Sequence, residues 1–179
     1  MLTVQGSVLV VIDVQEKLFP AMFETETLLS NLHKMIKGSG LLGVPVIFTE
    51  QNPAGLGKTL PELSGLNLQN EPITKFDFNC CSESSFIEAL NCLNRRNVMV
   101  CGIEAHICVY QTSMDLLLRG FQVHLVGDCV SSRTSKNREL ALRRLESEGV
   151  KLTGVEMALF ELLRSSKSPQ FKAISSLIK

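Results

Sequence analysis

Hydrophobic residues in this sequence gather in short, uninterrupted runs that are separated by longer segments of mixed polarity. The first run, residues 8–12, reads Val-Leu-Val-Val-Ile, with β-branched side chains and no alternation of apolar and polar positions. Such a run is typical of a strand that is buried on both faces of a parallel sheet. Further strands are predicted at residues 44–49, 98–101 and 121–126, and a weaker edge strand is predicted at residues 150–153.

The segments between these runs carry apolar residues at helical spacing. They predict helices over residues 24–42, 83–93, 106–119, 135–148, 155–163 and 170–178. Strands that alternate with helices of about ten or more residues indicate βαβ units with right-handed crossovers. We therefore predict an α/β fold, a Rossmann-like three-layer α/β/α arrangement around a mostly parallel sheet of five to six strands. No repeat, low-complexity tract or linker divides the chain, which predicts a single domain over residues 1–179.

One long segment, residues 50–71, is rich in Gly, Pro and Asn and shows little periodicity. Long loops of this kind tend to be functional. The segment leaves the carboxyl end of the second predicted strand, and open α/β sheets bind ligands at that edge. We therefore expect this segment to form a lid or a pocket wall.

Two glycine-rich stretches imitate nucleotide-binding motifs. Residues 38–43 read Gly-Ser-Gly-Leu-Leu-Gly, but they close a predicted helix and lead into a strand, the reverse of the order that a dinucleotide fingerprint requires. Residues 57–59 read Gly-Lys-Thr, like the end of a P-loop, but a Leu-Pro pair follows where a helix should begin. We expect no nucleotide cofactor, and we interpret the first stretch as a helix end with its turn.

The composition narrows the classes of partner and compartment. The 179 residues carry 18 basic and 18 acidic side chains, and this zero net charge, without a long basic run, argues against nucleic acid or an anionic membrane as a partner. No apolar segment reaches the roughly 20 residues that span a bilayer, and the first residues lack the features of a signal peptide. The six cysteines, at positions 80, 81, 92, 101, 108 and 129, have no C-x-x-C spacing for zinc or redox chemistry. We expect a mature, cytoplasmic protein with reduced thiols.

Three polar residues lie where predicted strands end or helices begin. Asp13 directly follows the first strand, where it is either a catalytic base or a turn or helix-cap residue. Lys75 lies in a short apolar segment ahead of the helix at residues 83–93, where it is either half buried beside a carboxylate or a surface lysine with an apolar stem. Cys108 lies in the first turn of the helix after the 98–101 strand, where the helix dipole and free backbone N–H groups stabilise a thiolate and can hold an oxyanion. Position favours Cys108 as the one working thiol, and the other five cysteines are expected to pack as small hydrophobic residues.

The order and spacing of these residues resemble the isochorismatase-like cysteine hydrolase superfamily, which includes nicotinamidase and N-carbamoylsarcosine amidase. The resemblance covers nearly the whole chain and is carried by Asp13 with Gln15 and Phe19, Lys75 with Phe78, and Gly-Ile-Glu-Ala-His-Ile-Cys-Val over residues 102–109. Residues 49–51, 55–57 and 168–172 resemble more narrowly the uncharacterised isochorismatase-domain hydrolases.

The resemblance implies a role for each matching residue. Cys108 would be the nucleophile, Asp13 the base that takes its proton and returns it to the leaving group, and Lys75 the cation that holds Asp13 and favours the thiolate. A cis peptide bond between Ile103 and Glu104 would aim the Glu104 N–H, together with that of Cys108, at the oxyanion of a tetrahedral intermediate. A thiol of this kind is expected to alkylate faster than the other five near neutral pH.

Some residues of the expected substrate pocket have two possible interpretations. It includes Gln15, Phe19, Glu50, Gln51, Phe78 and His106. Glu50 and Gln51 either recognise polar groups of the substrate or only begin the loop. His106 either faces the pocket or lies exposed at the helix start.

Departures from the family limit the expected chemistry. Metal-dependent nicotinamidases carry an Asp-x-His pair and a further His where this chain has Glu50, Gln51 and Asn52, so no metal is expected. True isochorismatases cleave a vinyl ether without a cysteine at the position of Cys108, so the amidase-like branch is nearer in chemistry. We expect a hydrolase that cleaves a C–N bond of a small amide-type substrate without a cofactor. The alternatives are a vinyl-ether hydrolase and a non-catalytic binding protein on the same scaffold.

The family forms dimers or larger oligomers, which implies a homo-oligomer here. The apolar residues of the two predicted C-terminal helices, at residues 155–163 and 170–178, either supply that interface or pack on the sheet.

Overall fold

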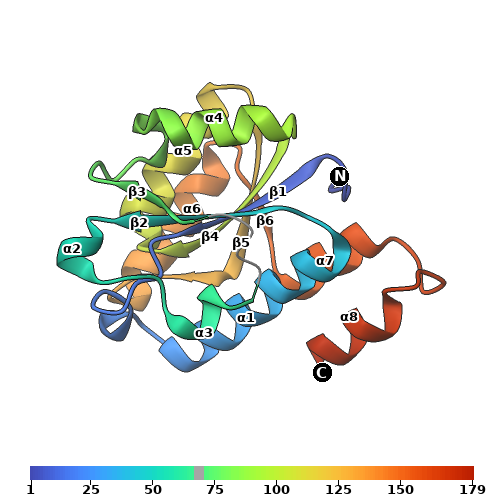
Figure 1. Ribbon diagram of the computed structural model, residues 1–179. Helices are drawn as coiled ribbons and strands as arrows, with labels where there is room; N and C mark the ends of the chain where they lie inside the picture. Colours follow the sequence, from blue (N-terminus) through green and yellow to red (C-terminus); the bar gives the residue numbers. More distant parts are fainter. Residues whose placement is uncertain (67–70) are drawn as a thin grey trace.

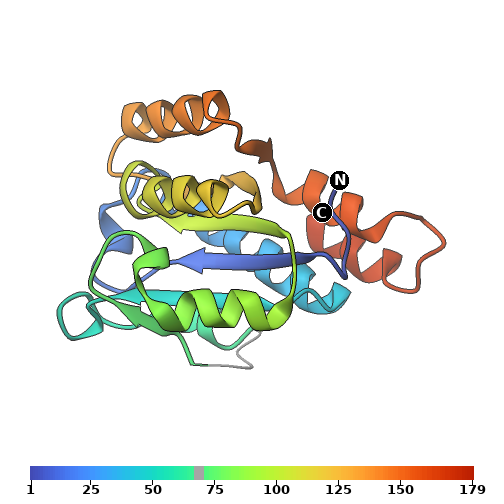
Figure 2. The ribbon, with the colours of Figure 1, turned by 90° about the horizontal axis from the view of Figure 1, so that it is seen from above.

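A parallel sheet forms the centre of the protein and is covered by helices on both faces (Figures 1 and 2). The structure is a computed structural model, and it describes residues 1–66 and 71–179. Within these residues the sheet has six strands in the order β3-β2-β1-β4-β5-β6, and every neighbouring pair is parallel. The strands are β1 (Ser7–Ile12), β2 (Val46–Gln51), β3 (Ile73–Lys75), β4 (Asn97–Ile103), β5 (Gln122–Ser131) and β6 (Lys151–Thr153). The predicted α/β fold is confirmed.

The predicted helices are present, each with ends within two residues of the prediction when the π-helical turn ahead of α5 is counted with it. The longer ones are α1 (Thr25–Leu42), α4 (Ser84–Leu93), α5 (Tyr110–Leu118), α6 (Ser135–Ser147), α7 (Val155–Leu163) and α8 (Phe171–Ile178). The helix predicted at residues 106–119 begins with a five-residue π-helical turn, η3 (Ala105–Val109), which continues into α5. Across the described helices, none combines the length and the hydrophobicity that a membrane crossing needs.

The burial of β1 explains why its sequence has no polar alternation. Leu9 and Val11 belong to the apolar cluster that includes α1, α7 and α8, whereas Val8, Val10 and Ile12 belong to the cluster that includes α4, α5 and α6. Water is excluded from both faces of this strand, so each position favours a hydrophobic side chain. The same two-sided burial makes β1 and its neighbours the frame from which the loops at the carboxyl edge extend.

The strands differ from the prediction mainly at this carboxyl edge. β5 continues to Ser131, five residues beyond the predicted end, after an irregularity in its pairing with β4. The hydrophobic pattern does not predict β3, because this edge strand has three residues and pairs only with β2. The segment 50–71, predicted as a loop, contains the short helices α2 (Pro53–Leu56) and α3 (Pro61–Ser64). Its residues 67–70 lie outside the described part of the chain.

The glycine-rich stretch at residues 38–43 ends a helix, as the sequence predicts. Gly43 terminates α1 in a left-handed conformation with φ of 76°, and its N–H donates to the carbonyl of Gly40 at 3.0 Å. Gly38 faces α7 so closely that a Cβ there would meet the Leu159 side chain at 2.6 Å. These glycines terminate and pack a helix, and they offer no helix N-terminus to a pyrophosphate.

The two C-terminal helices pack against α1 (Figure 1). Their buried side chains are Val155, Ala158, Leu159, Leu162 and Leu163 of α7 and Ile174 of α8. For these residues the packing alternative is confirmed. Phe160 remains 36% exposed, and its ring meets that of Phe171 edge to face at 6.5 Å.

One close contact between β1 and β4 fixes the carboxyl edge. Gly102 of β4 lies opposite Ile12 of β1 and adopts a φ of 113°. A Cβ on Gly102 would lie 2.1 Å from the carbonyl oxygen of Ile12, so no side chain fits there. The contact sets the position from which the chain leaves β1 on one side and approaches η3 on the other.

We expect the substitution Gly102→Ala to destabilise the fold by about 3 kcal/mol or more, because the methyl group meets backbone that cannot move aside and the φ is unfavourable for L-residues. Gly120→Ala is the matched control, since Gly120 also has a positive φ (84°) but has open space around it, and it should cost about 1 kcal/mol. Urea unfolding followed by far-UV circular dichroism measures both. Equal losses for the two variants would contradict the steric argument.

Candidate active site

A buried ion pair lies at the carboxyl edge of the sheet. Asp13 directly follows β1 and adopts a left-handed backbone conformation with φ of 53°, which turns the chain as it leaves the strand. Lys75 is the last residue of β3, and its Nζ lies 2.7 Å from Oδ2 of Asp13. Both side chains are fully buried. The structure thus brings together two of the three predicted catalytic residues.

Thr49 of β2 completes the surroundings of the Asp13 carboxylate. Its hydroxyl donates a hydrogen bond to Oδ1 of Asp13 at 2.8 Å, and its carbonyl accepts one from the Asp13 N–H at 3.2 Å. Thr49 lies opposite Ile12 in the strand register. The sequence reasoning assigned Thr49 no role in the site, and the available signal was a lone hydroxyl near the end of a buried strand that neighbours the one carrying Asp13.

Lys75 has oxygen partners on several sides. Besides Asp13, its Nζ donates to Oε1 of Gln51 at 2.7 Å and to the carbonyls of Asp77 and Phe78 at 3.2 Å each. Desolvation by burial lowers the pKa of Lys75, but the negative charge of Asp13, followed by weaker contributions from neighbouring thiols, outweighs it and raises the net pKa. The ammonium group therefore remains charged and anchors Asp13.

Cys108 lies in η3, and its residue surface is only 5% exposed. Burial raises the pKa of the thiol most, and the negative charge of Asp13 adds to this effect, whereas Lys75 lowers the pKa. The net result is a pKa of about 12, so the resting thiol holds its proton at neutral pH. Burial and the charge of Asp13 thus outweigh Lys75, and both oppose the thiolate that the sequence leads us to expect at the helix start.

The chain between β4 and Cys108 forms a tight bend around Glu104. The peptide bond between Ile103 and Glu104 is cis. The carbonyl of Glu104 accepts hydrogen bonds from the N–H groups of Ile107 at 3.0 Å and Val109 at 3.3 Å, which closes the π-helical turn. Within the described part of the chain, no backbone carbonyl accepts a hydrogen bond from the Glu104 N–H. This turn therefore presents both a thiol and a backbone donor.

Gln15 and Gln51 use their amides to hold the chain together. The Nε2 of Gln15 donates to the carbonyls of Gln51 at 3.0 Å and Gly57 at 2.7 Å, and its Oε1 accepts from the Gln51 N–H at 2.8 Å. The Nε2 of Gln51 donates to the carbonyl of Phe76, while its Oε1 binds Lys75. For Gln51 these contacts favour a structural role over recognition of the substrate.

Glu50 also serves the loop that follows β2. Its Oε1 accepts hydrogen bonds from the N–H and the hydroxyl of Thr59, at 2.7 and 2.8 Å. Glu50 is buried, and these two bonds hold α2 and the chain after it against the sheet edge. A role in the loop is therefore favoured for Glu50 as well.

The remaining predicted pocket residues lie in different surroundings. Phe19 is buried in the apolar cluster on the α1 side of the sheet. Phe78 is 53% exposed, and only its backbone carbonyl reaches Lys75. His106 is half buried, with Nδ1 at 2.9 Å from Oγ of Ser132 and Nε2 at 3.5 Å from Nδ2 of Asn137. Both ring nitrogens of His106 are thus engaged by the chain.

A second thiol, Cys80, lies next to the ion pair and has no role in the sequence-based site. It is fully buried, its Sγ lies 3.8 Å from the hydroxyl of Thr49, and its N–H donates to Thr112 at 3.0 Å. Burial and then the charge of Asp13 raise its pKa to about 11. Its spacing from Lys75 along the chain gave no signal, because the turn after β3 that places it beside Asp13 is visible only in the structure.

The other cysteines correct one expectation. Cys81, Cys101 and Cys129 are buried, as predicted, but Cys92 on α4 is exposed. Cys92 is therefore the most accessible thiol, and it is expected to react with alkylating reagents ahead of Cys108. Within residues 1–66 and 71–179, no three His, Cys, Asp or Glu side chains are grouped in a metal-binding arrangement.

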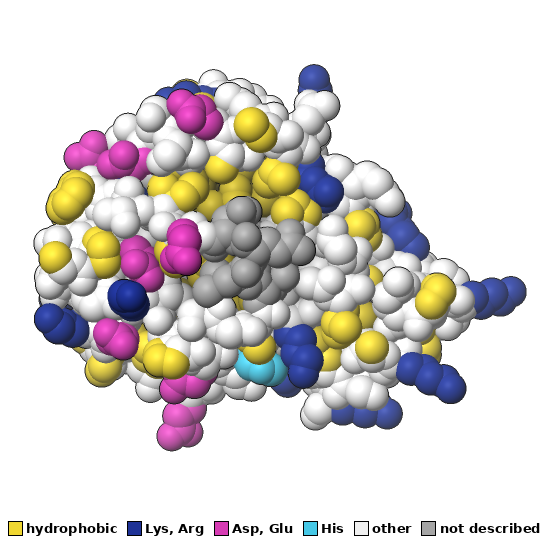
Figure 3. Space-filling model, viewed as in Figure 1, with side chains coloured by type: hydrophobic (Ala, Val, Ile, Leu, Met, Phe, Trp, Pro, Cys, Tyr) yellow, Lys and Arg dark blue, Asp and Glu magenta, His cyan; other side chains and the backbone are white. Residues whose placement is uncertain are grey.

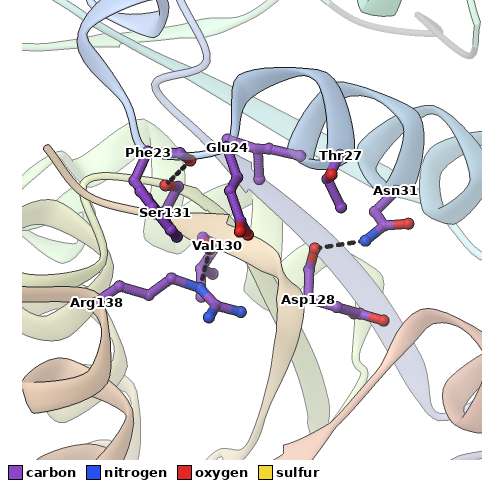
Figure 4. A pocket seen from close by; sticks show the side chains of 9 residues that line it. Phe23, Glu24, Thr27, Asn31, Asp128, Val130, Ser131 and Arg138 are labelled. Carbon is purple, nitrogen blue, oxygen red and sulfur yellow. Dashed lines mark hydrogen bonds between the residues drawn. The ribbon is translucent and has the colours of Figure 1, made fainter. Parts of the chain in front are cut away.

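A cavity of about 230 Å³ lies between the start of α1 and the end of β5 (Figure 4). No member of the Asp13, Lys75 and Cys108 set lines it. Across it, Asn31 donates to the carbonyl of Asp128 at 2.9 Å, and the Ser131 hydroxyl donates to a carbonyl of the β1–α1 connection at 2.7 Å. These bonds hold the end of β5 against the start of α1.

Comparison with known proteins identifies the family. The sequence matches the Isochorismatase domain over residues 7–157. The chain belongs to the isochorismatase family of hydrolases. It is 41% identical to isochorismatase domain-containing protein 2 of Danio rerio, over 99% of this chain and 89% of that protein. It is also 41% identical to the secreted isochorismatase effector Isc1 of Phytophthora sojae, over 97% of this chain and 85% of that protein.

Solved structures of related proteins have the same fold. The MAR1 ribonuclease of Caenorhabditis elegans superposes with a TM-score of 0.93 at 37% identity, covering 99% of this chain and 91% of that one. The YcaC gene product of Escherichia coli, described as an octameric hydrolase of unknown specificity, superposes with a TM-score of 0.94 at 19% identity, covering 99% and 88%. These matches confirm the family that the sequence motifs of this isochorismatase-family hydrolase resemble.

The charges around Cys108 predict opposite effects of two substitutions on its alkylation by iodoacetamide at pH 7.5. Asp13→Asn removes a charge that raises the pKa of the thiol, so the thiolate fraction and the labelling rate should rise. Lys75→Met removes a charge that lowers this pKa, so labelling should slow. Timed labelling read by peptide mass spectrometry, in a Cys92→Ser background, measures both rates.

Cys81 is the internal control for this experiment. It has the same 5% exposure and a pKa of about 12, but its pKa is raised by burial and then by Asp115, away from the ion pair. Its labelling rate should not change in either variant. A shift of Cys108 in the same direction in both variants would contradict the electrostatic account of the site.

Proposed function

We propose that this isochorismatase-family hydrolase cleaves a C–N bond of a small amide-type substrate through a Cys108-Asp13-Lys75 triad and an acyl-enzyme. The observation that carries the proposal is the fully buried Asp13 carboxylate, which is paired with Lys75 at 2.7 Å and whose negative charge acts on the Cys108 thiol. A base beside a nucleophile, itself held by a third group, is the general arrangement of nucleophilic catalysis.

The proton follows a closed path in this mechanism. As the Cys108 sulfur attacks the substrate carbonyl carbon, its proton passes to Asp13, and a C–S bond forms while the carbonyl oxygen takes up the negative charge. Asp13 then gives the proton to the leaving nitrogen as the C–N bond breaks. In the second half, Asp13 takes a proton from water, the hydroxyl attacks the acyl carbon, and the proton returns to sulfur as the acid product leaves.

Two backbone N–H groups are assigned to the oxyanion. The Glu104 N–H has no carbonyl partner among the described residues, and it lies in the same turn as the Cys108 N–H. Donors that are fixed in place before the reaction stabilise charge as it develops, at no cost in reorganisation. The Ile103–Glu104 cis peptide belongs to the same bend.

The proposal includes no cofactor, metal or nucleic acid. A homo-oligomer, dimer or higher, is part of it, and the description of Escherichia coli YcaC as octameric supports that part. We also propose a cytoplasmic location, although the related Isc1 protein is described as a secreted effector.

A ribonuclease activity is a second candidate, because the related Caenorhabditis elegans protein is described as the MAR1 ribonuclease. In this chain both nitrogens of His106 are engaged by Ser132 and Asn137, so its ring is not placed as a free proton-transfer group. On the face shown in Figure 3, basic side chains lie mainly toward α7 and α8 and acidic ones mainly toward α2. These features favour the small-molecule hydrolase. Vinyl-ether hydrolysis and non-catalytic ligand binding are two further functions that the same scaffold could serve.

A screen of amides, carbamoyl compounds, vinyl ethers and RNA should identify hydrolysis of an amide or carbamoyl compound by the wild type. Cys108→Ala should lower its rate by at least about a thousandfold, because the nucleophile is lost. Cys92→Ala is the matched control for loss of a thiol and should keep full activity. Turnover that survives Cys108→Ala would contradict the acyl-enzyme, and if it is restricted to vinyl ethers or to RNA it would favour the corresponding hydrolase.

A further inference from the structure

The chain that follows β5 contacts the nucleophile turn through residues that are separate from the ion pair. Arg133 Nε lies 3.3 Å from each carboxylate oxygen of Glu104. The His106 ring lies between Ser132 and Asn137, at 2.9 and 3.5 Å. We call these contacts of Glu104 and His106 with residues 132–137 the turn brace. None of its members belongs to the proposed triad.

Glu104 is the central residue of the brace, because its three polar groups have different tasks. Its carbonyl closes η3 by accepting from Ile107 and Val109, and its N–H is the proposed oxyanion donor. Its carboxylate is 6% exposed, and Arg133 is the one cation that lies within 4.0 Å of it in the described part of the chain. A carboxylate with so little access to water is unfavourable without a partner, so the position of Arg133 constrains that of Glu104.

His106 restrains the same turn two residues later. The Asn137 side chain donates through Nδ2, so Nε2 of His106 accepts, and the hydrogen on Nδ1 is left to donate to Ser132. The turn brace therefore contacts the turn at two residues ahead of Cys108, which are Glu104 and His106. The end of β5, from which residues 132–137 extend, is itself hydrogen-bonded to the chain at the start of α1 across the cavity of Figure 4. These bonds restrain the segment that forms the turn brace.

Arg133 itself is largely in solvent, with a side chain that is 65% exposed. Water screens the Arg133 side of this ion pair, so its loss should cost the fold less than the loss of one partner from a fully buried pair such as Asp13 and Lys75. The contact thus fits a role in geometry better than a role in stability.

We propose that Arg133 is a positioning residue for the acyl-transfer step: its ion pair with Glu104 holds the Glu104 N–H in line with the developing oxyanion. This assignment rests on the proposed cysteine hydrolase function. It differs from that function in its prediction, because Arg133 acts on the oxyanion and leaves the reactivity of the thiol unchanged.

The test uses p-nitrophenyl acetate as an acylation probe and iodoacetamide as a probe of the thiol alone. With the ester, the Cys108 sulfur forms a bond to the acetyl carbon, p-nitrophenolate leaves, and Asp13 takes the thiol proton. Arg133→Met should lower the acylation rate constant about tenfold to a hundredfold, since displaced oxyanion donors lose that much. Arg133→Lys should recover part of the loss. The alkylation rate of Cys108 should stay as in the wild type, and the melting temperature should fall only slightly, because Arg133 is largely in solvent.

Arg143→Met is the matched control, because Arg143 is exposed on α6 and lies away from the brace. It should leave acylation unchanged. A Glu104→Gln variant should lose about as much as Arg133→Met, and the double variant should lose little more, since both changes break one contact.

The outcomes separate this assignment from the function on which it rests. A wild type without a Cys108-dependent burst of p-nitrophenolate would contradict the proposed function and the assignment with it. A wild-type burst that Arg133→Met leaves intact would overturn the assignment alone. Equal slowing of acylation and alkylation by Arg133→Met would also overturn it, because the effect would then lie in the thiol or in the fold.

Discussion

The arrangement of the site depends on the burial of one ion pair. Removing a carboxylate and an ammonium group from water costs several kcal/mol for each ion, and their attraction offsets this only when geometry and further hydrogen bonds are good. Here Asp13 receives the Thr49 hydroxyl, and Lys75 donates to the Gln51 side chain and to two carbonyls. These partners come from β2 and from the chain just after β3, while Asp13 follows β1 and Lys75 ends β3. The pair therefore requires that the carboxyl ends of three strands meet in one register.

Cys108, the proposed nucleophile, is positioned by a second constraint, which is steric. Gly102 lets β4 approach the backbone of Ile12 closely, and the chain then bends through Glu104 into the π-helical turn that carries Cys108. Backbone geometry thus positions the Cys108 thiol, whereas the ion pair with Lys75 positions the Asp13 carboxylate. Because different strands carry the two groups, a displacement of either strand end would separate the proposed base from the proposed nucleophile.

The sequence predicted those parts of the fold that rest on two-sided burial. The central strands β1 and β4 and all the longer helices carry continuous or periodic apolar patterns, and the structure has them where they were expected. β3 escaped prediction because an edge strand of three residues needs only a short apolar stretch. Thr49 and Cys80 escaped for another reason: their place beside Asp13 depends on strand register and on a turn, which no single-chain periodicity encodes. The resemblance of the motifs identified Asp13, Lys75 and Cys108, but not the protonation of the thiol.

The proton on Cys108 decides which groups of the site transfer a proton and which stabilise negative charge in the proposed mechanism. A resting thiolate would leave Asp13 without a proton to take, and the negative charges of the two groups would oppose each other. Burial and the charge of Asp13 instead keep the proton on Cys108, so a strong nucleophile arises only while the substrate carbonyl is being attacked. Charge then moves from the buried carboxylate to the substrate oxygen in one step, and its stabilisation falls on the backbone N–H groups of the nucleophile turn. A site of this kind must hold that turn as firmly as it holds Asp13, which is the physical reason for a brace on the turn in addition to the ion pair on Asp13.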